Sequence, residues 1–113
     1  MEQKVIRSQS KNVQVSPQKM RLVADVVRGL NVEKALDVLK FMNKKGAAFL
    51  RKVVATAAAN AKDLHGVDAG NLEISKLTID EGVKYRRPKF ASRGRVSMLH
   101  KRRSNINLEV KVK

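Results

Sequence analysis

The sequence contains no cysteine and no tryptophan, and its 113 residues include one tyrosine and three phenylalanines. Without cysteine there is no disulfide, no thiolate nucleophile and no thiolate metal site, which fits a reducing compartment. No apolar run approaches the roughly 18 residues that a membrane-spanning helix requires. The first residues also lack the apolar stretch of a secretory signal and the arginine-rich pattern of a transit peptide. We therefore expect a soluble cytoplasmic protein without a membrane partner.

Acidic residues are scarce as well, with 10 Asp and Glu against 25 Lys and Arg, which gives a formal net charge of +15. Residues 1–81 hold 14 basic and 9 acidic residues, a net of +5, whereas residues 82–113 hold 11 and one, a net of +10. The stretch from Gly82 to Ser104 has nine basic residues and no acid. Because so much charge on a small protein repels itself, a polyanionic partner is the first hypothesis.

Helical periodicity in the first two thirds of the chain predicts three helices. Residues that favour helix starts or helix ends bound them; in chain order these are Ser16-Pro17, Gly29, Asn31 and Gly66. The third helix is expected after Gly46, with an apolar stripe from Ala47 to Leu64. On the first helix, Arg21 and Asp25 have the i,i+4 spacing of an ion pair.

Alternation of apolar and polar residues predicts three strands. Leu72 and Ile74 alternate, and Leu77 and Ile79 repeat the pattern one residue out of phase, which a bulge near residues 75–76 explains. The pattern over residues 106–112 is unbroken, and a less clear strand lies around residues 5–6. The predicted fold is α+β, with three helices packed on one face of a small three-stranded antiparallel sheet.

The basic stretch connects the second and third of these strands, so it is predicted to form a long extended β-hairpin. We call residues 82–104 the arm. A connection of 23 residues is long for a compact domain and is usually functional or disordered. We expect a single domain over residues 1–113, divided into a globular body (1–81 and 105–113) and the protruding arm, which becomes ordered when anions lie along it.

Residues of the arm are candidates for contacts with RNA. Lysine and arginine neutralise phosphates, and aromatic rings and guanidinium planes stack on unpaired bases. For Tyr85 and Phe90 the alternative is packing across the hairpin. Gly94 allows the backbone to approach a phosphate closely. The candidates on the arm are Lys84, Tyr85, Arg86, Arg87, Lys89, Phe90, Arg93, Gly94, Arg95, Lys101, Arg102 and Arg103.

Two predicted helix starts are further candidates, because free N–H groups and the positive end of the helix dipole attract phosphate. The first start carries Ser16, Lys19 and Arg21, and Lys44 and Lys45 precede the third helix. The alternative at each start is an ordinary surface lysine.

The sequence offers little for catalysis. His65 and His100 are the only histidines, they lie in different segments, and neither belongs to an HxxxH or HxH pattern. There is no GxSxG and no P-loop. Asp80 and Glu81 are adjacent on a predicted strand, where neighbouring side chains point apart, so a metal-dependent nuclease is disfavoured. We expect no enzyme, no cofactor and no metal.

Several motifs resemble one known family. The run from Ser16 to Asp25, closed by Arg28-Gly29, resembles the first helix of the large-ribosomal-subunit proteins numbered twenty-two in the bacterial series. Further matching motifs follow in the same order over nearly the whole chain: Asn60-Ala61, His65-Gly66, Asp80-Glu81-Gly82, Gly94-Arg95 and Lys101-Arg102. The chain departs from the pattern at Val83, where proline is usual, and at Asn105, where histidine is usual.

The resemblance implies an α+β body on the outer surface of the large ribosomal subunit, bound to the large-subunit rRNA and beside neighbouring ribosomal proteins. It also implies a hairpin that runs inward to line the nascent-peptide exit tunnel, with the nascent polypeptide near its tip. Such a protein supports subunit assembly and translation in a bacterium or an organelle, and no homo-oligomer is expected. The alternative is a free-standing architectural or regulatory protein that binds RNA or DNA.

Overall fold

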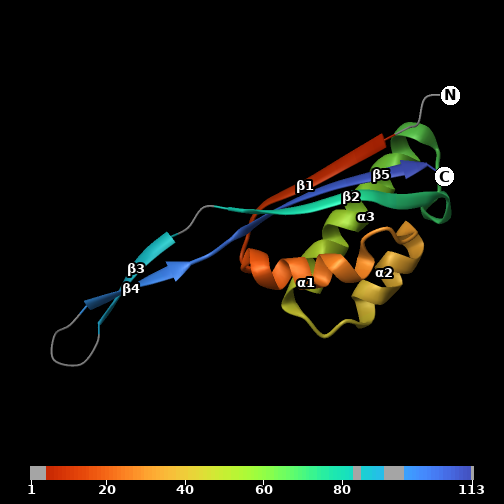
Figure 1. Cartoon of the computed structure of the whole chain (residues 1–113). Coiled ribbons are helices and arrows are strands. Elements are labelled where there is room, and N and C mark those ends of the chain that lie inside the picture. Colours follow the sequence, from red (N-terminus) through yellow and green to blue (C-terminus); the bar gives the residue numbers. More distant parts are fainter. Residues whose placement is uncertain (1–4, 83–84, 91–95, 113) are drawn as a thin grey trace.

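The computed structural model describes residues 5–82, 85–90 and 96–112. It has two parts, a body with three helices against a sheet and a narrow ribbon that extends from one end of that sheet (Figure 1). The overall dimensions are 66 × 26 × 19 Å. The elements in chain order are β1 (Val5–Val13), α1 (Pro17–Val27), α2 (Val32–Phe41), α3 (Lys45–His65), the 3₁₀ helix η1 (Ala69–Asn71), β2 (Leu72–Glu81), β3 (Tyr85–Phe90), β4 (Val96–Lys101) and β5 (Ser104–Val112).

The body sheet has the strand order β1-β5-β2, and both neighbours of β5 pair with it in the antiparallel sense. The unbroken alternation of β5 suits this central position, because Ile106, Leu108 and Val110 all point into the core and are buried. On β2 the register slips between Ile74 and Lys76. The bulge that the sequence predicted there is therefore confirmed, as is the α+β fold.

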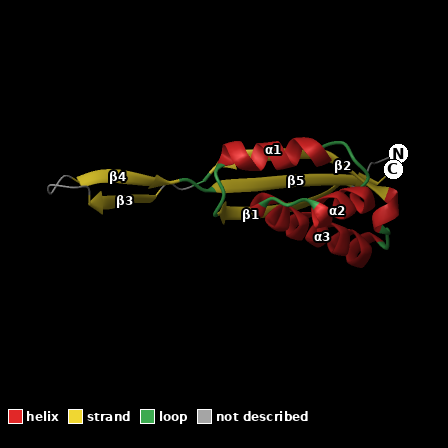
Figure 2. Cartoon of the chain, turned by 90° about the horizontal axis from the view of Figure 1, so that it is seen from below, coloured by secondary structure: helices red, strands yellow, loops and turns green. Residues whose placement is uncertain are grey.

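The helices cover only one face of the body sheet. α1 packs on β2, α3 packs on β1 and β5, and α2 packs on α3 (Figure 2). The core between these layers is aliphatic, and its largest fully buried side chains include Met20, Leu50, Leu72, Ile106 and Leu108. The other face of the sheet is not covered by any described element of the chain.

The predicted ends of α1 and α3 and the predicted starts of α1 and α2 are confirmed. Gly29 and Gly66 have φ angles of +82° and +64°, the left-handed conformation that glycine adopts readily after a helix. Asn31 caps α2, because its side-chain oxygen accepts a hydrogen bond from the Glu33 N–H at 2.9 Å. Ser16 precedes α1 as its N-cap residue, but its side chain makes no capping hydrogen bond.

Two sequence predictions about side chains were wrong. Asp25 pairs with Arg28 rather than with Arg21, whose guanidinium instead reaches strand β2. Leu64 was expected in the core but is 73% exposed. It lies two helical turns beyond the buried Ala57 and on the same face of α3, so the core ends before the last turn of that helix.

Helix α3 also begins earlier than predicted, at Lys45, so that Gly46 lies inside its first turn and is buried. A Cβ atom at this position would lie 2.6 Å from the sulfur of Met20, which is itself fully buried in α1. Glycine leaves room here for the buried Met20 side chain between α1 and α3.

We expect Gly46→Ala to destabilise the protein by about 1 to 3 kcal/mol, because the added methyl overpacks a buried contact. Urea unfolding followed by circular dichroism measures this loss. Gly70→Ala is the matched control, since its Cβ would meet only the mobile end of the Glu33 side chain at 3.1 Å. Equal stability of the two variants would contradict the close contact between α1 and α3.

Candidate nucleic-acid interface

The ribbon of the arm is a two-stranded antiparallel sheet whose register runs from Tyr85 opposite Lys101 to Phe90 opposite Val96. Its strands carry four basic residues and no acid. Five candidates lie on β3 (Tyr85, Arg86, Arg87, Lys89 and Phe90), and Lys101 ends β4. Lys84, Arg93, Gly94 and Arg95 lie outside the described residues.

Hydrogen bonds between three segments of the chain meet at the root of the arm. The Gly82 N–H donates to the carbonyl oxygen of Arg103 at 2.7 Å, and the buried Ser104 hydroxyl donates to the carbonyl oxygen of Val15 at 2.6 Å. The Asn12 N–H donates to the side-chain oxygen of Asn105 at 3.0 Å. The first bond joins the two ends of the arm to each other, and the other two join Ser104 and Asn105 to the segment at the end of β1.

Gly82 lies where two segments of the chain approach each other closely. A Cβ atom there would lie 3.2 Å from the backbone of Arg103 and 3.2 Å from the Asn105 side chain. Glycine therefore permits the close approach of the two chain segments at the arm root. Near the arm root, Asn12 has a left-handed backbone conformation with φ +58°. It lies where the register of β1 on β5 shifts.

A basic hollow of about 320 Å³ lies beside the arm root and is lined by Gln14, Lys45, Arg102 and Arg103. Three of its four residues are cationic and none is acidic. Arg103 also reaches toward the body, because its Nη1 donates to the Asn12 carbonyl oxygen at 3.4 Å. The hollow joins the arm to the first residue of α3.

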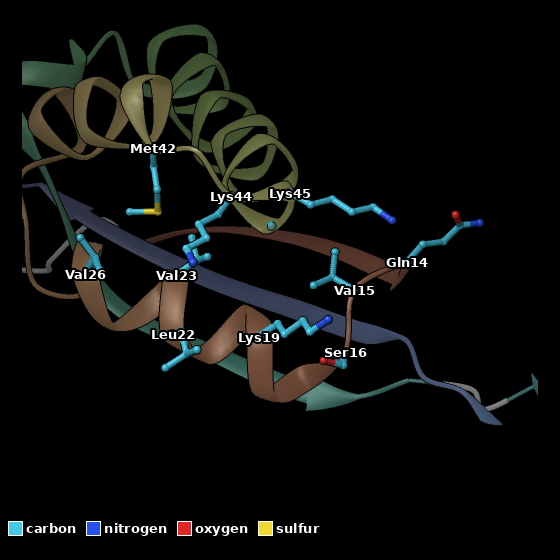
Figure 3. A pocket seen from close by; sticks show the side chains of 11 residues that line it. Gln14, Val15, Ser16, Lys19, Leu22, Val23, Val26, Met42, Lys44 and Lys45 are labelled. Atoms are coloured by element: carbon cyan, nitrogen blue, oxygen red, sulfur yellow. The ribbon is translucent and has the colours of Figure 1, made fainter. Parts of the chain in front are cut away.

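A larger groove of about 710 Å³ adjoins the starts of α1 and α3. We call it the α1–α3 groove; its lining residues are Gln14, Val15, Ser16, Lys19, Leu22, Val23, Val26, Met42, Lys44, Lys45 and Gly46. The two helix starts that the sequence indicated separately therefore meet at one surface feature. Met42 and Val26 lie at one end of the groove, and Gln14, Ser16 and Lys45 lie at the other (Figure 3).

Lys45 lines both the basic hollow and the α1–α3 groove, so basic side chains continue from the arm root onto the body. No acidic residue lines either feature. The sequence did not reveal the apolar part of this groove, formed by Leu22, Val26 and Met42. One signal was available, since Leu22 and Val26 are apolar residues one turn apart on the face of α1 opposite to its buried stripe.

The uncovered face of the body sheet has a different character. Two of its cations are paired, with Arg7 2.9 Å from Glu109 and Lys111 3.0 Å from Glu73. Paired charges of opposite sign leave little net potential to attract a polyanion. The basic hollow and the α1–α3 groove differ from this face because no acidic residue lines either of them.

Arg21, one of the predicted RNA contacts, forms a hydrogen bond with strand β2. Its Nη2 donates to the carbonyl oxygen of Ile79 at 3.0 Å, and Arg28, two helical turns later, donates through Nη2 to the carbonyl oxygen of Leu77 at 2.9 Å. Strand β2 is an edge of the sheet, so these carbonyls have no strand partner on that side. The two arginines therefore fasten α1 to the free edge of β2.

The described residues meet the requirements of neither a metal site nor a membrane-spanning helix. Among the residues described, no group of three or more His, Cys, Asp or Glu side chains could hold a metal ion. None of the described helices has both the length and the apolar character needed to cross a membrane.

Two comparisons with known proteins agree with the motifs. The model of the family described as ribosomal protein L22p/L17e matches residues 8–111. Large ribosomal subunit protein uL22 of Desulfotalea psychrophila is 44% identical over 102 residues, which cover 90% of this chain and 93% of that protein. The chain belongs to the ribosomal protein L22p/L17e family. The resemblance inferred from the motifs is thereby confirmed, and it places the chain among structural proteins of the ribosome.

In this L22p/L17e protein we expect Arg21→Ala to lower the free energy of unfolding by about 1 kcal/mol, because the Ile79 carbonyl loses a charged donor but regains water. Urea unfolding tests this, with Lys19→Ala on the same helix as the control. An unchanged stability would contradict the fastening of α1 to β2. A lowered affinity for rRNA, measured on the same variant, would support the RNA contact predicted for Arg21.

Proposed function

We propose that this protein is a structural constituent of the large ribosomal subunit that binds large-subunit rRNA, supports subunit assembly and lines the nascent-peptide exit tunnel with its arm. The observation that supports RNA binding best is the continuity of positive charge. Basic residues without acidic neighbours follow the arm, and Arg102, Arg103 and Lys45 carry the path onto the body.

The proposal assigns different tasks to body and arm. The body (1–81 and 105–113) has the hydrophobic core and positions the protein on the particle. The arm (82–104) is a narrow ribbon that passes between RNA segments, with its lysines and arginines on phosphates and Tyr85 and Phe90 on unpaired bases. Its tip, which includes Arg93, Gly94 and Arg95, lies near the nascent polypeptide. Neighbouring ribosomal proteins are further partners, and no cofactor takes part.

The helix-start residues do not all have the same surroundings. Lys45 belongs to the basic hollow beside the arm root and is included in the RNA path. Ser16, Lys19 and Lys44 lie along the α1–α3 groove, next to apolar side chains. Their predicted contact with RNA is tested together with that groove.

Sedimentation of a cell lysate separates the proposed function from the alternative of a free-standing RNA- or DNA-binding protein. We expect the protein in the large-subunit peak at one copy per subunit, as measured by quantitative mass spectrometry. Another large-subunit protein serves as the internal standard. A pool found mainly at the top of the gradient would support the alternative.

Removal of the arm tests its share of the RNA affinity. Deleting residues 84–95 takes away six basic residues, and we expect weaker binding to large-subunit rRNA. If all six contact phosphates, the slope of log affinity against log salt becomes shallower by about 4 to 5. Filter binding between 50 and 200 mM KCl, with circular dichroism to verify folding, measures both effects.

The matched control removes the same charge from the body. It changes six exposed residues that line neither the basic hollow nor the groove to glutamine: Lys34, Lys40, Arg51, Lys52, Lys62 and Lys76. An equal loss in both variants would mean that net charge, rather than the arm, sets the affinity. An unfolded body in the deletion variant would refute the division into body and arm.

A further inference from the structure

The α1–α3 groove has an apolar floor, and phosphate binding does not account for apolar side chains there. Leu22 and Val26 stand one turn apart on α1 and are 66% and 50% exposed, and the half-buried Met42 lies beside them in the same groove. Scattered exposed apolar residues need no explanation, but apolar residues that converge in a concave site mark a place where a partner binds.

The rim of the groove is positive. Lys19, Lys44 and Lys45 line it, and no acidic residue does. Helices α1 and α3 both begin at the groove, and neither has an acidic residue in its first turn. The positive ends of both helix dipoles are therefore not offset locally, and the rim favours a carboxylate or another anion.

The composition of the floor favours protein over RNA. Unpaired bases stack on aromatic rings and guanidinium planes, and the groove is lined by neither. Ribose and phosphate are polar, so an RNA strand would cover Leu22 and Val26 without burying them against apolar atoms. A polypeptide segment with aliphatic side chains and a nearby carboxylate satisfies both the floor and the rim.

A second copy of the chain fits less well. A two-fold symmetric contact brings the same surface of each copy together. The lysines on the rim of one groove would then face the same lysines of the other, and like charges at close range oppose association.

We propose that the α1–α3 groove binds an aliphatic and acidic segment of another protein. Its aliphatic side chains pack on Leu22, Val26 and Met42, and an Asp or Glu within a few residues pairs with Lys19 or Lys44. The groove is thus a protein-docking surface next to the RNA path. The inference rests on the proposed function only for where the partner is found, which is the assembled large subunit.

Site-directed cross-linking tests the proposal, and the absence of cysteine makes the labelling specific. Leu22→Cys and, separately, Val26→Cys are labelled with a benzophenone maleimide, assembled into large subunits and irradiated. Nuclease digestion and mass spectrometry then identify the product. Leu64→Cys is the control, because Leu64 is also an exposed leucine on a helix but lies outside the groove.

We expect both groove positions to cross-link to the same segment of a second protein, at least fivefold more than Leu64→Cys does. That segment contains aliphatic residues and an acid. Lys19→Glu with Lys44→Glu, added to Leu22→Cys, should lower the yield about tenfold, whereas Lys34→Glu with Lys40→Glu on α2 should not. Cross-linking to rRNA, to another copy of this chain or to nothing at both groove positions would overturn the proposal.

The same experiment keeps the two proposals separate. If the labelled protein is missing from the large-subunit peak, the proposed function fails. The irradiation is then repeated in the fraction where the protein does sediment, and the same outcomes decide whether the groove docks a protein there.

Discussion

The pairing of β2 with β5 is the contact on which the rest of the structure depends. These strands are separated in the sequence by the whole arm, so bringing them together closes a long loop and costs chain entropy. The cost is offset in the body, where Leu72, Ile74, Leu77 and Ile79 on β2 and Ile106, Leu108 and Val110 on β5 are all buried under the helices. Because the two strands lead directly into the arm, the core of the body also determines where the arm leaves it.

The free edge of β2 shows how the body protects this pairing. An edge strand exposes unpaired N–H and carbonyl groups on which another chain could pair. Here the Ile74 N–H donates to the Leu30 carbonyl at 2.9 Å, and Arg28 and Arg21 cover the carbonyls of Leu77 and Ile79. Helix α1 and the turn after it thus act as a substitute for a fourth strand. Two cations that composition alone would assign to a partner therefore support the fold as well.

Local chemistry was predictable from the sequence, and long-range geometry was not. Helix boundaries follow from local preferences: glycine readily adopts the left-handed conformation after a helix, as at Gly29 and Gly66, and the Asn31 side chain caps the start of α2. The bulge near residues 75–76 is visible in the sequence as a break in a two-residue period. That Lys19, Lys44 and Lys45 line the same groove depends instead on how α1 packs against α3. Where the two helices pack together, Gly46 lies against Met20, a contact between residues 26 positions apart that no local pattern encodes.

The packing of α1 against α3 places a basic surface and an aliphatic surface next to each other on the body. Close packing at Gly46 brings the starts of α1 and α3 together, so their positive ends and lysines collect beside the arm root. The part of the groove farther from the arm root is lined by Leu22 and Val26 of α1. Both are exposed aliphatic side chains on the otherwise polar face of that helix. On the uncovered face of the sheet, ion pairs between neighbouring strands neutralise Arg7 and Lys111. Lys45 lines both the basic hollow and the α1–α3 groove, so a polyanion that follows the arm reaches the body at Lys45, where the groove begins.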